Sequence, residues 1–283
     1  MNFLSLNIRS ISDKAKARWV NKLKQDHHLN FLCLLETHKQ EASSLNPHSF
    51  WGNYNFSHDF IPSSGSEERS GGILSIWDPS FFTLTNTLKS NHFLLTSGLI
   101  NGISEQCNIL NLYAPQELQA KQNLWDEITT LIANTQGLWI ILGDFNSVRC
   151  PDERMHSMFN DSCALSFNSF IHQNGLMEYT MNGNLFTYVA DNGKKKSKID
   201  RVLVSSSFMN NWPRASLTAL PRSLSDHRPL ILNTSHLDFG PSPFRIFTSW
   251  FNRPGFNDVV CDSLNSGFYN GRPDKSSQQS SES

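Results

Sequence analysis

The stretch Leu-Trp-Ile-Ile-Leu-Gly-Asp-Phe-Asn at residues 138–146 is a run of large apolar residues that ends in a glycine and a carboxylate. A solid apolar run of this length predicts a buried strand, which we expect to stop at Gly143. Asp144 would then lie where the strand reaches the edge of its sheet. One acid in such a place most often only ends a strand, so its meaning depends on the neighbouring strands.

Polar side chains end or border several other predicted strands in the same way. They are Asn7 in strand 3–8, Glu36 after strand 31–35, Tyr113 in strand 108–113, Asn146 just beyond Asp144, Asp200 in strand 198–204, and Asp226 and His227 before strand 229–234. Hydrolysis of a phosphodiester needs a hard divalent cation on oxygen ligands, an activated water and donors to the phosphate. This set of residues contains all the groups required.

The remaining pattern predicts a mixed α/β sandwich, with one sheet packed on another and helices outside. Helical periodicity covers residues 12–27, with Ser12 as the cap, 115–134, and 162–174 before Gly175. Further strands are expected at 72–77 and 81–88. Asp191-Asn192-Gly193 predicts a hairpin between strands 185–189 and 198–204.

Charge and cysteine content exclude several classes of protein. The 24 Lys and Arg residues nearly balance the 25 Asp and Glu residues, so only a local patch would attract a polyanion. The densest such patch is Lys194, Lys195, Lys196 and Lys198, which is also what a solvated hairpin tip looks like. The 5 cysteines include no Cys-x-x-Cys pair, which favours a reduced compartment over disulfides or structural zinc.

The apolar runs are too short to cross a membrane, and the N-terminus lacks the basic region of a signal peptide, so we expect an intracellular protein without a membrane partner. Residues 1–236 are predicted to form one catalytic domain. From residue 237 the composition changes, and Pro241-Ser242-Pro243 breaks the chain. Residues 237–283 are therefore expected to be a linker-like segment with a disordered Ser/Gln-rich end.

The ordered motifs resemble the endonuclease/exonuclease/phosphatase superfamily. Within it, they are most similar to the endonuclease domain of plant-type non-LTR (LINE) retrotransposons. The resemblance covers residues 2–235 and rests on Asn7, Glu36, Leu112-Tyr113-Ala114-Pro115, Gly143-Asp144-Phe145-Asn146, Ile199-Asp200-Arg201 and Ser225-Asp226-His227. It implies a four-layer α/β/β/α sandwich of two mixed sheets flanked by helices, with the site at one end of both sheets.

The resemblance also implies residue roles. The metal site, for Mg²⁺ with Mn²⁺ as a substitute, would be made by Asn7, Glu36, Asp144, Asn146, Asp226 and His227, with Glu36 as the principal ligand. The catalytic set would be Tyr113, Asp144, Asn146, Asp200, Asp226 and His227. In it, Asp144 aligns the water, Asn146 and Tyr113 contact the phosphate, and Asp200 orients His227.

Three positions depart from the family pattern. Leu6 replaces the usual Trp before Asn7, Ser10 replaces a glycine, and Tyr188 stands where relatives often have Trp. None of these changes removes a catalytic group. Ser10 lacks the backbone freedom of glycine, so we expect the loop there to shift.

The function implied is a DNA-nicking, Mg²⁺-dependent phosphodiesterase from a LINE-type element, located in the nucleus. DNA would be held by Lys194, Lys195, Lys196 and Lys198, with Arg149, Arg154, Arg201 and Arg228 as further candidates. The reverse transcriptase of such elements is absent from this chain. The alternatives are a catalytically silent remnant, a nucleic-acid-binding module, or a phosphoesterase of the same fold acting on abasic DNA, RNA or a phosphoinositide.

Overall fold

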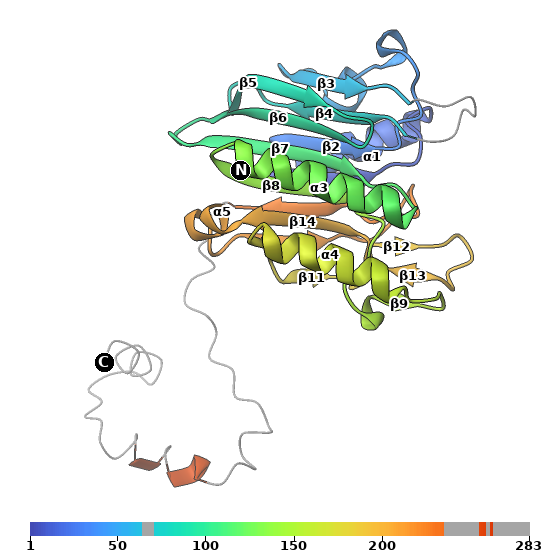
Figure 1. Ribbon diagram of the computed structural model, residues 1–283. Helices are drawn as coiled ribbons and strands as arrows, with labels where there is room; N and C mark the ends of the chain where they lie inside the picture. Colours follow the sequence, from blue (N-terminus) through green and yellow to red (C-terminus); the bar gives the residue numbers. More distant parts are fainter. Residues whose placement is uncertain (64–70, 235–254, 259–260, 263–283) are drawn as a thin grey trace. The chain divides into compact units, whose positions relative to one another are not determined.

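The computed structural model describes residues 1–63, 71–234, 255–258 and 261–262 (Figure 1). The chain divides into two units, Met1–His236 and Leu237–Ser283, and the elements below belong to the first. Most of residues 237–283, including the predicted linker-like segment and the Ser/Gln-rich end, lies outside the described residues. The described part contains no helix with the length and apolar character needed to span a membrane.

Two mixed sheets form the centre of the first unit. The 7-stranded sheet has the order β11 (Met181–Gly183), β15 (Ser216–Ala219), β16 (Leu230–Asn233), β1 (Asn2–Asn7), β2 (Phe31–Leu35), β4 (Ile73–Trp77) and β3 (Ser57–Ile61). The 6-stranded sheet has the order β10 (Leu176–Glu178), β14 (Asp200–Ser205), β8 (Leu138–Asp144), β7 (Gln106–Tyr113), β6 (Phe93–Ile100) and β5 (Phe82–Lys89).

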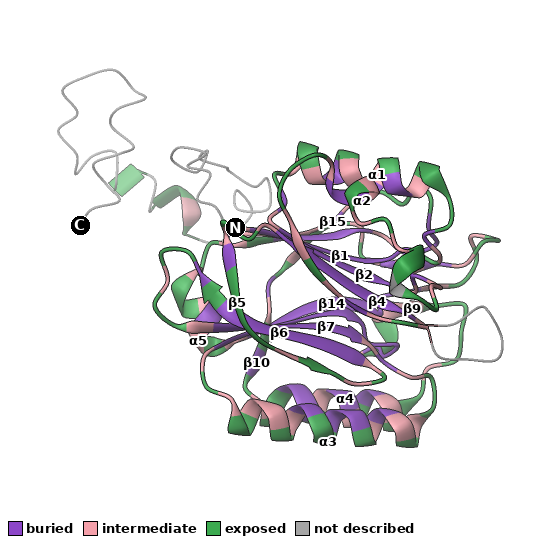
Figure 2. Ribbon diagram, turned by 90° about the horizontal axis from the view of Figure 1, so that it is seen from above, coloured by how far each residue is buried: buried purple, intermediate pink, exposed green. Residues whose placement is uncertain are grey.

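Helices cover the outer face of each sheet, and this confirms the predicted four-layer sandwich (Figure 2). On the first sheet lie α1 (Lys14–Asp26) and the short α2 (His48–Trp51), which bury Val20 and Trp51 against β1, β2 and β4. On the second lie α3 (Leu118–Asn134) and α4 (Asp161–Gln173). Helix α5 (Ser206–Asn211) follows β14, and two short 3₁₀ turns span Ala42–Ser44 and Pro151–Glu153.

Aromatic side chains fill the space between the two sheets. The Phe31 ring stacks on Trp77 at 5.6 Å between ring centroids and meets Phe82 edge-on at 5.7 Å. All three side chains are buried, and Phe82 comes from the opposite sheet. These contacts tie the sheets together.

A small third sheet lies beside the second one and corrects the predicted hairpin. It consists of β12 (Tyr188–Val189), β13 (Lys196–Ser197) and β9 (Arg154–Met155). The Asp191-Asn192-Gly193 turn is present, with Gly193 at φ 71°, but it joins two very short strands. The strand predicted at 198–204 instead pairs with β8 and β10, because its solidly apolar stretch is buried in the second sheet.

Several other boundaries differ from the prediction. Five strands of the two large sheets were not predicted: β3, β6, β10, β11 and β15. In β6 the polar run around Thr96 hides any regular alternation, and β10, β11 and β15 are only three or four residues long. Helix α1 begins at Lys14, and its cap is Asp13, which accepts from the Ala15 N–H, rather than Ser12. Helix α3 begins only at Leu118.

Gly143 does not stop β8 but lies inside it. Its φ is 143°, and a Cβ there would come within 2.0 Å of the Leu112 carbonyl oxygen of β7. Glycine is therefore needed for the close approach of the two strands immediately before Asp144.

Candidate active site

Strand register brings the predicted polar residues to one end of the sandwich. In the parallel pair β1–β2, Asn7 lies opposite Leu35, so Glu36 follows beside it. In the parallel pair β7–β8, Tyr113 lies opposite Asp144, and the antiparallel β14 places Asp200 opposite Asp144 as well. The sheet pairing alone therefore gathers residues that are far apart in the sequence.

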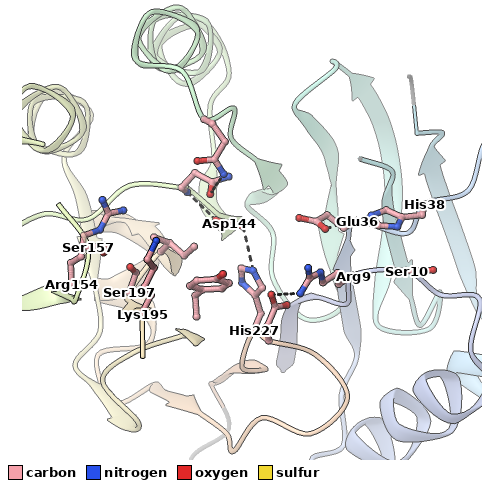
Figure 3. Close-up of a pocket in the computed structure, with 15 residues that line it drawn as sticks. Arg9, Ser10, Glu36, His38, Asp144, Arg154, Ser157, Lys195, Ser197 and His227 are labelled. Atoms are coloured by element: carbon pink, nitrogen blue, oxygen red, sulfur yellow. Dashed lines mark hydrogen bonds and ion pairs between the residues drawn. The ribbon is translucent and has the colours of Figure 1, made fainter. Parts of the chain in front are cut away.

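A cavity of about 740 Å³ lies at this end of the sandwich, and Glu36 and Asp144 line it, whereas Asn7, Tyr113 and Asp200 lie behind its walls (Figure 3). Its walls include Arg9, Glu36, Asp144, Asn146, Asp226 and His227 from the two large sheets and their loops, and Arg154, Tyr188, Lys195 and Ser197 from the small sheet and its turn. The cavity thus contains most of the predicted site and opens between the sandwich and the hairpin.

Asn7 joins two carboxylates at the floor of the cavity. Its side-chain amide donates to Glu36 Oε1 at 2.8 Å and to Asp144 Oδ2 at 3.2 Å. The Asn7 side-chain oxygen accepts from the Arg9 N–H at 3.2 Å. A neutral amide can orient two carboxylates but cannot cancel their charge, so this end of the cavity keeps an excess of negative charge.

His227 is held by Asp200. The Nδ1 atom lies 2.9 Å from Asp200 Oδ2, and Nε2 lies 3.9 Å from Asp144 Oδ2. Burial lowers the pKa of His227, but the charge of Asp200 and its hydrogen bond, with the charges of Asp144 and Asp226, outweigh burial and raise it to about 10. The imidazole is therefore a cation at neutral pH that can donate to a phosphate oxygen through Nε2.

Two further groups have shifted proton equilibria. Burial, followed by the negative charge of Asp200, raises the pKa of Asp144. Such a carboxylate is suited to take a proton from an attacking water. Burial, followed by the charge of Glu36, raises the pKa of Tyr113, so its phenol keeps its proton at neutral pH and remains a donor.

Asp226, which was expected to be a metal ligand, has a cationic partner of its own. Arg9 Nη1 lies 2.7 Å from Asp226 Oδ2 and 3.6 Å from Asp191 in the hairpin turn. Arg9 was not among the predicted site residues, although it stands only two residues after Asn7, the last residue of β1. The neighbouring Ser225 hydroxyl donates to the Asn7 carbonyl at 2.7 Å and fixes the Ser-Asp-His motif against β1.

Asn146 is held in place by hydrogen bonds to groups that were not predicted to belong to the site. Its side-chain amide donates to the Ala114 carbonyl at 2.7 Å, and its side-chain oxygen accepts from Gln116 Nε2 at 2.6 Å. Its backbone carbonyl accepts from Lys121 Nζ at 2.7 Å, and its N–H donates to Asp144 Oδ1 at 2.9 Å. The orientation of Asn146 is thus coupled to that of Asp144.

Backbone strain is concentrated around the cavity. Arg9, Ser10, Glu36, His38 and Asn146 all have φ between 48° and 79° and all line the cavity. Such conformations are unfavourable for residues with a Cβ and persist where the surrounding structure fixes them. Ser10, at φ 79°, occupies the very conformation that favours the glycine of the family pattern.

The basic run does not act as one surface. Lys194 and Lys195 are exposed, Lys196 is half-buried, and Lys195 lines the cavity. Lys198 is buried, and its Nζ lies 2.9 Å from Glu178 Oε1. Lys198 is therefore corrected from a DNA contact to a partner in an internal ion pair.

The candidate arginines divide in the same manner. Arg201 is fully buried and paired with Glu153 and Glu178, so it cannot extend a surface track. Arg154 lines the cavity. Arg149 is partly exposed and bonds Asn168, and Arg228 donates to the Phe186 carbonyl.

The donor set fits a divalent metal ion. Asp144, Asp200 and His227 place ligand atoms within 4.8 Å of one another, but Asp200 and His227 are already joined by a hydrogen bond. Glu36 and Asp144, bridged by Asn7, are the better candidates because neither pairs with a lysine or an arginine among the described residues; their nearest basic groups are the imidazoles of His38, 3.5 Å from Glu36, and His227, 3.9 Å from Asp144. A hard cation bound to these oxygens would supply positive charge to the phosphate.

Fold and site together define a phosphoester hydrolase of the nuclease and phosphatase class. The chain belongs to the Endonuclease/Exonuclease/phosphatase family, whose sequence model matches residues 4–227. Members of this family typically depend on divalent metal ions, in accord with the buried acidic cluster. No curated protein sequence matches the chain.

Solved structures share the fold at low sequence identity. The AP endonuclease LMAP from Leishmania major superposes with a TM-score of 0.68 at 15% identity, covering 83% of this chain and 87% of that one. The 3′ phosphatase NExo from Neisseria, bound to a product DNA hairpin, gives 0.62 at 16%, covering 83% and 99%. The endonuclease domain of TRAS1, a telomere-specific non-LTR retrotransposon, gives 0.57 at 11%, covering 83% and 99%.

The role assigned to Asp200 predicts how His227 titrates. In metal-free protein, the Asp200→Asn substitution removes the charge that raises the pKa of His227, so this pKa should fall from about 10 toward its ordinary value of 6.5. The histidine Cε1–H resonances in an NMR pH titration measure it. Asp191→Asn, at an exposed acid that pairs with Arg9, should leave the value unchanged. An unaltered His227 titration in Asp200→Asn would refute the assignment.

Proposed function

We propose that this protein is a Mg²⁺-dependent phosphodiesterase that nicks DNA, from a LINE-type retrotransposon of the plant type, and that it acts in the nucleus. The observation that carries the proposal is the meeting, in one cavity, of the Asn7–Glu36–Asp144 cluster with the Asp200–His227 pair. One group supplies oxygen ligands for a hard cation, and the other supplies a positively charged donor for the scissile phosphate.

The residues divide the chemistry between them. Asp144 accepts the proton of the attacking water, in line with its raised pKa. His227 donates through Nε2 to a non-bridging phosphate oxygen, and Asp200 keeps it protonated. Tyr113 is the last residue of β7, and Asn146 lies two residues beyond the end of β8. Both contact the scissile phosphate.

Support for DNA as the substrate comes from the cavity rim and from the similar structures. Lys195 and Arg154 line the cavity on the side of the small sheet, where a nucleic acid strand would leave the catalytic centre. The 3′ phosphatase with a similar fold is bound to a DNA hairpin, and another similar structure is a retrotransposon endonuclease domain.

A plasmid assay tests the proposal. Purified protein should convert supercoiled plasmid to the nicked form with Mg²⁺ and not with EDTA. Glu36→Ala and His227→Ala should each lower the rate by about 100-fold or more, because each removes a group that acts on the transition state. Glu127→Ala and His172→Ala, at exposed positions on α3 and α4, serve as matched controls and should keep the wild-type rate.

The outcomes separate the alternatives. Absence of nicking by a folded wild-type protein would contradict the proposal and favour a catalytically silent remnant. Cleavage only of plasmid that contains abasic sites, or only of RNA or a phosphoinositide, would keep the chemistry and change the substrate. Nicking that persists in both site variants would point to a contaminating nuclease.

The corrected basic run gives a second prediction. Replacing Lys194, Lys195 and Lys196 by Gln should weaken DNA binding and reduce the slope of log K against log salt by up to about 0.9 per lost phosphate contact. Fluorescence anisotropy with a short duplex in EDTA measures this slope. A matched pair of changes at Arg18 and Lys22, exposed on α1, should leave it unchanged. Equal binding by the lysine variant and the wild type at low salt would exclude the hairpin as a DNA contact.

A further inference from the structure

Lys121 of α3 is a buried cation without an acidic partner among the described residues. Its side chain is 4% exposed, whereas the other buried cations, Lys198 and Arg201, both pair with Glu178. The ammonium of Lys121 donates instead to the Asn146 carbonyl at 2.7 Å and to Cys163 Sγ at 3.5 Å. A buried charge with only neutral partners is unfavourable unless an anion compensates it.

A separate cavity of about 180 Å³ lies next to this ammonium. This volume is several times the ~30 Å³ that one water molecule occupies in the liquid, so the cavity is large enough for a phosphate group. Its polar lining includes Lys121, Arg154, Gln116, Ser147 and Asn160, and none of the described residues that line it is acidic. Among the described residues, the buried Nε atom of Arg154 has no hydrogen-bond partner, while its Nη1 donates to the Met158 carbonyl.

Two helices begin at the same cavity. Leu118, the first residue of α3, and Asn160, the cap of α4, both line it, and the two helices lie side by side on the second sheet (Figure 2). The cap residue of α3, Glu117, makes no side-chain capping bond. The uncapped N-terminus of α3 therefore adds to the charges of Lys121 and Arg154, whereas at α4 the Asn160 side chain already accepts from the Cys163 N–H.

We propose that this side cavity, formed by Lys121, Arg154 and the starts of α3 and α4, is a second anion site that binds a phosphate group. It shares Gln116, Asn146 and Arg154 with the wall of the catalytic cavity. A phosphate bound here would therefore lie next to the one being cleaved. That it belongs to the same DNA strand rests on the proposed function, whereas the anion site itself does not.

The site also has a consequence for catalysis. Lys121 holds the backbone carbonyl of Asn146, and Asn146 in turn donates its N–H to Asp144. An anion that binds the Lys121 ammonium would weaken its hydrogen bond to the Asn146 carbonyl. It would thus change the positions of Asn146 and Asp144. The side cavity would couple binding of a neighbouring phosphate to the geometry of the catalytic centre.

Cys163 provides a probe of this cavity, because it lines the cavity and its Sγ lies beside Lys121. In metal-free buffer with EDTA, iodoacetamide labels the free thiols, and mass spectrometry reads each cysteine separately. Inorganic phosphate, compared with chloride at equal ionic strength, should slow labelling of Cys163 by about tenfold once its concentration is about ten times its Kd. Exposed Cys150 should be unaffected.

Two variants test the cations. Protection of Cys163 is the ratio of its labelling rates without and with phosphate, measured separately in each variant. In Arg154→Gln and in Lys121→Met, a given protection should need a higher phosphate concentration than in the wild type. Arg154 is only partly buried, so Arg154→Gln keeps the test valid if Lys121→Met fails to fold. Lys22→Met, at an exposed position on α1, is the matched control and should behave as wild type.

A second experiment, with DNA in place of inorganic phosphate, identifies the source of the bound phosphate group. Protection of Cys163 by a short DNA duplex, at concentrations where equivalent inorganic phosphate has no effect, assigns the site to a phosphodiester of the strand. Protection by inorganic phosphate alone assigns it to a free anion. No protection by either, equal slowing of Cys150, or unchanged protection in both variants would overturn the proposal. Labelling requires no turnover, so a failed nicking assay leaves this result independent.

Discussion

The mutual repulsion of carboxylates gathered at one end of the sandwich is the constraint on which the rest of the site depends. Glu36, Asp144, Asp200 and Asp226 all line or border one cavity, and each needs positive charge or hydrogen-bond donors in the folded protein. The structure compensates Asp200 with His227 and Asp226 with Arg9. Glu36 and Asp144 are bridged by the neutral amide of Asn7, and among the described residues neither pairs with a lysine or an arginine, so this is where we expect a cation to bind.

The fold makes this crowding possible by register rather than by sequence proximity. Parallel pairing of β1 with β2 and of β7 with β8 brings their carboxyl ends to the same side, while β14 returns antiparallel beside β8. The close approach at Gly143 joins β7 and β8 within the second sheet, and the aromatic packing around Phe31 ties the two sheets together. The strands thus hold the acidic residues at fixed positions, and the strained backbone at Glu36 and Asn146 sets the direction of the side chains there.

The acidic and amide residues of the candidate site could be selected from sequence because each ends or borders a clear apolar strand in a family-like order. Their partners could not. Arg9, Lys121 and Gln116 lie in loops or on a helix, and only tertiary packing brings them to Asp226 and Asn146. For the same reason the prediction that Lys198 contacts DNA was wrong, because the pattern of charges in the lysine run does not reveal that Lys198 pairs with Glu178 inside the protein.

Metal binding by the protein without substrate tests the central claim most directly. Titration of metal-free protein with Mn²⁺, followed by electron paramagnetic resonance, counts bound ions, and Mg²⁺ should displace them. We expect one bound ion per chain, which is lost or bound much more weakly in Glu36→Gln and retained in the control Glu127→Gln. No binding by folded wild-type protein, or binding unchanged in Glu36→Gln, would contradict it.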